Sequence, residues 1–325
     1  MSNRPIRRIA IIGTGVIGAS WTALFLAKGL EVIATDVAPD AEAALKRFVQ
    51  AAWPALERLG LAPGASQSHL TFTKDLPTAL KTADFVQENG PERVDFKKTL
   101  YRQLDELLPA DVIIASSSSG LTMSEIQSAC QMHPERCVIG HPFNPPHLVP
   151  LVEIVGGAKT SEATIRRAID FYSGLGKQAV RLHKEVPGHV ANRLQAALAR
   201  EVYYLVAEEV VSVADVDKAL CWGPGLRWGI MGQVLLNHLG GGPGGIEHFF
   251  DQFTGPLTAW WKTLGAPELT PAVRNKLIAG LYEEVGSRSI AELEAERDEI
   301  LLALLEARRK VEKAPAASQS AVAAN

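Results

Sequence analysis

Two residues in the middle of the chain have the types that acid–base chemistry requires. His141 ends a short apolar run over residues 137–140 and precedes a proline-rich turn, and Glu153 lies within a second apolar run over residues 151–155. Histidine exchanges a proton near neutral pH. A carboxylate inside an apolar strand is costly unless it is paired. We therefore predict that Glu153 pairs with His141 and that His141 acts as a general base; the alternative is an ordinary core histidine.

Four consecutive serines provide further polar groups near a predicted strand end. Ser116, Ser117, Ser118 and Ser119 follow the apolar run over residues 112–115. Their hydroxyls are suited to hydrogen-bond a cofactor, which we assign to Ser117, and a substrate oxygen; the alternative is a polar turn. The chain has no G-x-S-x-G motif, so nucleophilic serine chemistry is not favoured. Its three cysteines fit no metal-binding spacing, so we expect no metal.

A glycine-rich segment near the N-terminus has the pattern of a dinucleotide-binding loop. Gly13-Thr14-Gly15-Val16-Ile17-Gly18 matches G-x-G-x-x-G between a predicted strand over 8–12 and a predicted helix over 16–28. Gly13 allows the turn, Gly15 the approach of the pyrophosphate, and Gly18 close helix–strand packing. Val16 and Ile17 begin the helix whose positive end would receive the pyrophosphate. A bare glycine turn is the alternative.

Asp36 indicates which dinucleotide this loop would bind. It ends the next predicted strand, over residues 31–35, where a carboxylate accepts hydrogen bonds from the adenosine ribose. A carboxylate there repels a 2′-phosphate, so we predict NAD and not NADP as the cofactor.

The elements that position these residues alternate between strands and helices. Strand-like runs recur to residue 182 with helical patterns between them, which predicts an α/β fold with a Rossmann-type, doubly wound, mostly parallel sheet over residues 1–186. Beyond Pro187 the pattern is helical only, which predicts a second, all-α domain over 187–313 for substrate binding and dimerisation. The predicted helices there span 190–211, 215–221, 226–239, 271–285 and 289–312. The small and polar residues 314–325 predict a disordered tail.

The composition of the chain excludes several classes of partner. The 325 residues are 47% hydrophobic and 21% charged, with a formal net charge of −3. We therefore expect no nucleic acid and no membrane as a partner. The apolar run near the N-terminus breaks at Gly13, too early for a signal peptide, and the sparse cysteines fit a reducing compartment. The protein is expected to be cytoplasmic.

These motifs together resemble the 3-hydroxyacyl-CoA dehydrogenase superfamily. The resemblance rests on the glycine loop, Gln87-Glu88-Asn89, the serine run, the segment from Gly140 to Pro145, the run over 151–155, and Pro187-Gly188 followed by Asn192-Arg193-Leu194. It implies that His141 is the base and Glu153 its partner, that Ser119 and Asn192 bind the reacting oxygen, and that Glu88 lies by the cofactor. It also implies a Rossmann domain and a helical domain that makes a homodimer contact. Ser117 and Ser118 depart from the family, which usually has Asn or Thr inside this run.

Several stretches in both halves are similar to the L-carnitine dehydrogenase branch, including residues 51–56, 223–228, 238–250 and 288–293. The helix predicted over 39–59 is poor in lysine, unlike the members that grip the phosphates of CoA. The resemblance implies oxidation of the 3-hydroxyl of L-carnitine to 3-dehydrocarnitine with NAD. Candidates for the quaternary ammonium are the aromatic residues Phe143, Trp222, Trp228 and Phe253. Candidates for the carboxylate are Arg193 and Arg227. The alternatives are an L-gulonate 3-dehydrogenase, a short-chain L-3-hydroxyacyl-CoA dehydrogenase, and an NAD-binding structural protein of the crystallin kind.

Overall fold

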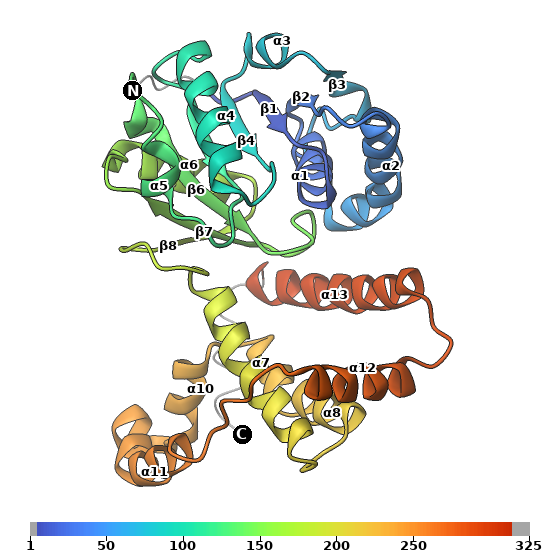
Figure 1. The fold of residues 1–325 in the computed structure, drawn as a ribbon, viewed down its shortest axis with the longest axis vertical. Coiled ribbons are helices and arrows are strands. Elements are labelled where there is room, and N and C mark those ends of the chain that lie inside the picture. The colour runs from blue at the N-terminus through green and yellow to red at the C-terminus, as the bar shows by residue number, and fades with distance from the viewer. Residues whose placement is uncertain (1–4, 314–325) are drawn as a thin grey trace. The chain divides into compact units, whose positions relative to one another are not determined.

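The computed structural model describes residues 5–313, so the predicted tail over 314–325 lies outside the described residues. The described residues form two compact units, one of residues 5–192 with 294–313, and one of residues 193–293. Figure 1 labels the elements of both.

The first unit is built on one sheet of eight strands in the order β3-β2-β1-β4-β5-β6-β7-β8. All neighbouring strands are parallel except β6 and β7, which run antiparallel. The strands are β1 (Arg8–Ile12), β2 (Glu31–Thr35), β3 (Leu70–Thr73), β4 (Phe85–Glu88), β5 (Ile113–Ser116), β6 (Cys137–Pro142), β7 (Leu151–Gly156) and β8 (Gln178–Arg181). The predicted α/β fold with a doubly wound, mostly parallel sheet is confirmed.

Helices cover both faces of this sheet, because side chains alternate along each strand. In β1, Ile9 and Ile11 join a core cluster with Trp21 and Phe25 of α1, whereas Ala10 and Ile12 join a second cluster. The helices before residue 191 are α1 (Val16–Ala27), α2 (Ala41–Leu59), α3 (Leu76–Leu80), α4 (Val94–Leu107), α5 (Met123–Gln127) and α6 (Glu162–Gly174), with short 3₁₀ helices η1 (Gln67–His69) and η2 (Pro134–Arg136).

The second unit is helical throughout its described residues. Its elements are α7 (Ala191–Ala207, whose first two residues belong to the first unit), α8 (Val213–Trp222), α9 (Pro224–Trp228), α10 (Gln233–Gly240), η3 (Gly242–Gly244), α11 (Gly245–Trp261) and α12 (Pro271–Val285). One helix predicted over 226–239 is therefore two, and α11 was not predicted. No helix of the described residues is long and apolar enough to cross a bilayer.

The last helix, α13 (Ile290–Lys313), belongs to the first unit from Glu294 onward. This differs from the predicted boundaries, which placed residues 187–313 together. Contacts with α2 account for the difference. The guanidinium of Arg58 lies 2.6 Å from Glu299 and 3.2 Å from Glu306, and Leu302 is buried. A helical pattern alone does not tell which domain a returning helix packs against.

Candidate active site

Candidate site residues lie at the ends of four neighbouring parallel strands, at one edge of the sheet. Gly13 follows β1, Glu88 ends β4, Ser117 follows β5, and His141 lies near the end of β6. The carboxyl ends of parallel strands share one edge, which is where open α/β sheets bind ligands. The topology therefore brings together the cofactor loop and the catalytic candidates.

The glycine loop has the geometry that a dinucleotide requires. Gly13 has a φ of +81°, and a Cβ atom there would lie 2.8 Å from the carbonyl oxygen of Asn89. A Cβ atom on Gly18 would overlap the carbonyl oxygen of Gly13, whereas one on Gly15 would meet no atom within 4 Å. Gly13 and Gly18 thus serve internal packing, and the open space over Gly15 is where a pyrophosphate can approach. Val16, which begins α1, is 61% exposed beside this space, and Ile17 packs on the core.

Asp36 lies at the end of β2 with its carboxylate already oriented. It accepts hydrogen bonds from the backbone N–H of Thr14 at 2.7 Å, from the Thr14 hydroxyl at 3.1 Å, and from the N–H of Ala38 at 2.9 Å. Partial burial alone would raise the pKa of Asp36, but these hydrogen bonds outweigh it and the pKa lies below its usual value. The group is ionised at neutral pH, which fits NAD and opposes a 2′-phosphate.

Glu88 is completely buried and its oxygens are occupied by neighbouring groups. Lys97 donates to them at 2.8 and 2.9 Å, the Ser116 hydroxyl at 2.6 Å, and the N–H of Gly90 at 2.6 Å. The carboxylate therefore holds the loop after β4 in place and presents no exposed oxygen. Glu88 was expected to lie by the cofactor. Its buried carboxylate instead supports the loop after β4.

Ser117 is likewise committed to protein partners. Its hydroxyl donates to Asn89 at 2.7 Å and accepts from Gln87 at 2.9 Å and from the indole N–H of Trp21 at 3.2 Å. One donor and two acceptor positions complete what a hydroxyl can offer. Ser117 thus joins β4, β5 and α1. Its hydroxyl has no hydrogen-bonding position left for the cofactor, contrary to the prediction.

His141 and Glu153 lie directly opposite one another on the antiparallel strands β6 and β7. His141 Nδ1 is 2.9 Å from Glu153 Oε2, and both residues are buried, at 4% and 1% exposure. The other carboxylate oxygen accepts from the N–H groups of Val190 and Ala191 at 2.8 and 2.9 Å, at the start of α7. Burial would raise the pKa of Glu153, but the hydrogen bonds from His141, Ala191 and Val190 lower it below its usual value.

An ionised Glu153 fixes the tautomer of the histidine. The carboxylate can only accept, so Nδ1 carries the proton and Nε2 presents a lone pair. Nε2 lies 3.2 Å from the hydroxyl of Ser119, which is exposed, unlike its neighbour Ser118. The Phe143 ring stands edge-on to the imidazole with centroids 6.3 Å apart. A basic nitrogen, a hydroxyl and an aromatic ring therefore meet at one point.

His189 also lies at this site and was not predicted from the sequence. Its ring centroid is 5.0 Å from that of His141, and its Nε2 donates to the carbonyl of Ser118 at 2.9 Å. Its Nδ1 is buried without a hydrogen-bond partner among the described residues. Burial lowers the pKa of His189, which favours a neutral ring beside His141. The residue braces the segment that presents Ser119. The sequence offered one signal for it, since His189 directly follows the Pro187-Gly188 motif.

The remaining predicted residues lie in or next to the second unit. Asn192 is half-buried in the first turn of α7, one residue after the Ala191 N–H that binds Glu153. Arg193 follows it in α7. Arg227 and Trp228 end α9; both are exposed, and the Trp228 indole donates to Gln233 at 2.6 Å.

Comparison with known proteins places these features in a family. A solved structure of 5-formyl-3-hydroxy-2-methylpyridine 4-carboxylic acid 5-dehydrogenase, an NAD-dependent dismutase, matches with a TM-score of 0.81 at 32% identity, over 96% of this chain and 100% of that one. An L-carnitine dehydrogenase of Streptomyces griseus is 49% identical over 93% of this chain and 90% of its own length. One of Pseudomonas putida is 48% identical over 93% and 94%.

Two family models cover most of the chain. The NAD binding domain of 3-hydroxyacyl-CoA dehydrogenase matches residues 8–186, and the C-terminal domain of the same family matches residues 188–283. The glycine loop, the ionised Asp36 and the matched domain together identify NAD as the cofactor. The chain belongs to the 3-hydroxyacyl-CoA dehydrogenase family of NAD-dependent oxidoreductases.

Proposed function

We propose that this enzyme oxidises the 3-hydroxyl of L-carnitine to 3-dehydrocarnitine, with His141 as the general base. The observation that carries the chemistry is the His141–Glu153 pair, whose Nε2 lone pair faces the Ser119 hydroxyl at 3.2 Å. The substrate is supported by the likeness to L-carnitine dehydrogenases over more than nine-tenths of the chain.

In the proposed reaction the chain's own residues manage the proton. His141 Nε2 takes the proton of the substrate hydroxyl, and the ionised Glu153 stabilises the imidazolium that forms. Ser119 and Asn192 hydrogen-bond the reacting oxygen, and His189 keeps the Ser118–Ser119 segment in position. NAD, held by Gly13–Gly18 and Asp36, supplies the acceptor for the hydride that leaves the substrate carbon. The alcohol thereby loses one proton and one hydride and becomes a ketone.

Two observations favour a small charged substrate over a CoA ester. Phe143 places an aromatic ring beside the base, and a quaternary ammonium prefers such a face. Two of the three cations of α2 are ion-paired: Lys46 binds Glu42 at 2.6 Å, and Arg58 binds two carboxylates of α13. They are poorly placed to grip CoA phosphates. We assign the remaining recognition to Arg193 or Arg227 for the carboxylate and to Trp228 as a second aromatic surface.

The test follows NADH formation at alkaline pH with L-carnitine, L-gulonate and 3-hydroxybutyryl-CoA side by side. We expect kcat/KM for L-carnitine to exceed the others by about 100-fold. His141→Asn should lose about a hundredfold to ten-thousandfold in kcat, whereas His69→Asn, which alters an exposed histidine of η1, should retain full turnover. Activity confined to the CoA ester would contradict the substrate. Stabilisation by NADH without turnover on any hydroxy acid would favour the structural-protein alternative.

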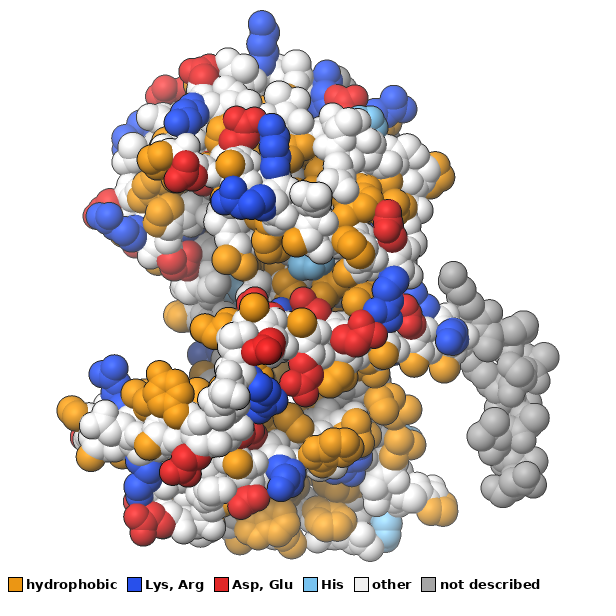
Figure 2. Space-filling model, turned by 90° about the vertical axis from the view of Figure 1, so that its right-hand side faces the viewer, with side chains coloured by type: hydrophobic (Ala, Val, Ile, Leu, Met, Phe, Trp, Pro, Cys, Tyr) orange, Lys and Arg blue, Asp and Glu red, His pale blue; other side chains and the backbone are white. Residues whose placement is uncertain are grey.

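We further propose a homodimer formed through the second unit, in the cytoplasm. Large hydrophobic side chains are exposed there in the single chain, including Trp222 at 78%, Trp261 at 66% and Tyr282 at 70%. Figure 2 shows hydrophobic side chains at many places on the surface of the molecule. Large apolar side chains exposed in such number favour an association site. Sedimentation of the purified protein at micromolar concentration should give twice the mass of one chain, and a monomer at that concentration would contradict the dimer.

A further inference from the structure

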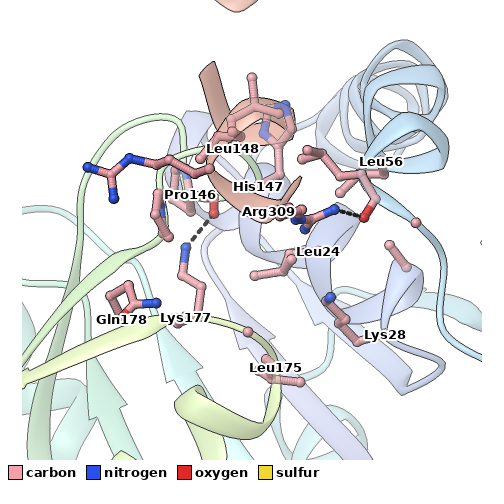
Figure 3. A pocket seen from close by; sticks show the side chains of 17 residues that line it. Leu24, Lys28, Leu56, Pro146, His147, Leu148, Leu175, Lys177, Gln178 and Arg309 are labelled. Carbon is pink, nitrogen blue, oxygen red and sulfur yellow. Dashed lines mark hydrogen bonds between the residues drawn. The ribbon is translucent and has the colours of Figure 1, made fainter. Parts of the chain in front are cut away.

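A cavity of about 120 Å³ lies between the sheet, the ends of α1 and α2, and α13 (Figure 3). Four basic residues line it, namely Lys28, Lys177, Arg308 and Arg309. Among the described residues, no Asp or Glu lines this cavity. This is an unusual concentration of positive charge for a chain whose formal net charge is −3.

Two of these cations, Lys177 and Arg309, donate hydrogen bonds to neutral backbone carbonyl oxygens. Lys177 Nζ donates to the carbonyl oxygens of Pro146 and Val149, both at 2.6 Å, and lies 5.1 Å from the ring centroid of Trp21. Arg309 donates to the carbonyl oxygen of Leu59. Carbonyl oxygens satisfy N–H donors but carry no net charge to oppose an ammonium or guanidinium. These carbonyl oxygens thus hold Lys177 and Arg309 in place without adding a negative charge.

The cations repel one another across the cavity. Burial, and then the charge of Arg309, lower the pKa of Lys28. Burial lowers the pKa of Lys177 to about 7, with a further contribution from Lys28. Lys28 Nζ lies only 3.7 Å from the position that a Cβ atom on Gly176 would take, next to Lys177. Lys177 is buried, Lys28 is half-buried, and Arg308 and Arg309 are exposed at the mouth of the cavity. A buried cation is costly unless a counter-charge joins it.

The other polar groups of the cavity are neutral donors or acceptors. Gln178 contributes an amide. His147 has its pKa lowered to about 4, chiefly by burial, with Lys177 and Arg297 contributing. Its ring nitrogen Nδ1 bonds to the Ser20 hydroxyl at 2.8 Å. Asp298 raises that pKa but is itself ion-paired to Arg297 at 2.8 Å. None of these neutral groups adds a negative charge to the lining of the cavity.

We propose that this cavity binds a small, doubly charged oxyanion, either inorganic phosphate or a short dicarboxylate. The volume of about 120 Å³ suits a compact ion. Lys28 follows the last residue of α1, whereas the cofactor loop lies at the first turn of this helix. Because α1 has 12 residues and a helix rises about 1.5 Å per residue, the two sites lie about 18 Å apart. The ion would join the end of α13 to the sheet and stabilise the first unit.

The test measures the thermal midpoint of the full chain with saturating NADH, so that the glycine loop is occupied. Potassium phosphate or succinate is titrated at constant ionic strength against chloride. We expect a saturable rise in the midpoint with at least one of the two ions. In Lys28→Gln the half-saturating concentration should increase about tenfold, the loss of one charged contact of about 1.4 kcal/mol. Arg309→Gln should weaken binding similarly and serves as the second variant.

Lys46→Gln is the matched control, because Lys46 is exposed on α2 and does not line the cavity. It should leave the titration unchanged. A saturable response to phosphate alone, or to succinate alone, supports the site and identifies the ion. A rise that is absent, that is linear in concentration, or that is unchanged from the parent in both Lys28→Gln and Arg309→Gln overturns the proposal.

Discussion

Replacing Glu153 by Gln removes the charge behind the general base while keeping the shape of the side chain. The substituted amide can still accept through its oxygen, but its nitrogen cannot accept from His141 or from the N–H groups of Val190 and Ala191. If the amide N–H faces Nδ1, the imidazole proton moves to Nε2 and the base loses its lone pair. If the carbonyl faces Nδ1, the tautomer survives but the imidazolium loses its counter-charge.

The size of the effect follows from the distance between the two groups. Nδ1 and Oε2 are 2.9 Å apart and Glu153 is 1% exposed. Unit charges at about 4 Å with an effective dielectric constant of about 20 interact by about 4 kcal/mol. At about 1.4 kcal/mol per factor of ten, kcat should fall by about three orders of magnitude.

The assay compares kcat of the parent, Glu153→Gln and Glu153→Asp by NADH formation, with the thermal midpoint as the control for folding. Because the pKa of Glu153 lies below its usual value, the parent carboxylate is ionised over the whole neutral-to-alkaline range of the assay. A Glu153→Gln enzyme with kcat within about tenfold of the parent and an unchanged midpoint would refute the role given to the carboxylate.

Three further predictions follow from other parts of the first unit. Gly18→Ala should lower the thermal midpoint because its Cβ would overlap Gly13. Gly15→Ala should keep the midpoint and weaken NADH binding, measured by fluorescence titration. If both variants changed the midpoint and NADH binding equally, the division of roles between the two glycines would be contradicted. Asp36→Ser removes the charge that opposes a 2′-phosphate, so the NADP-to-NAD ratio of kcat/KM should rise by about tenfold or more; an unchanged ratio would count against it. The folded state releases the Lys177 proton near pH 7 and the unfolded state only near 10.5, so stability should rise with pH between these values by up to about 1.4 kcal/mol per pH unit. Urea unfolding at pH 7, 8 and 9 without phosphate should show this slope for the parent but not for Lys177→Met, and parallel curves would exclude it.

The sequence predicted well the features whose signals are local. The glycine loop, Asp36 and the strands of the sheet each depend on residues close together in the chain, and the structure has the predicted fold. The pairing of His141 with Glu153 was also accessible, because an apolar strand with one carboxylate requires a partner for it.

Features that depend on distant residues were not accessible. The supporting role of Glu88 depends on Lys97, which lies on a helix and is buried only once α4 packs on the sheet. The hydroxyl of Ser117 is occupied by groups from three elements. Helix α11 begins directly after a glycine run and contains Pro256, two signals that favour a loop. The return of α13 to the first unit depends on Arg58, more than 200 residues earlier.

The antiparallel pairing of β6 and β7 has a consequence for changing substrate preference. The register of the ladder, and not the connection over residues 143–150, holds His141 opposite Glu153. Phe143 and the exposed Asn144 lie at the start of that connection, next to the imidazole but outside the paired positions. The proposed catalytic pair and the proposed recognition residues beside it can therefore be changed separately. Libraries at positions 143 and 144 should redirect the enzyme among small hydroxy acids while the proton-transfer step is retained.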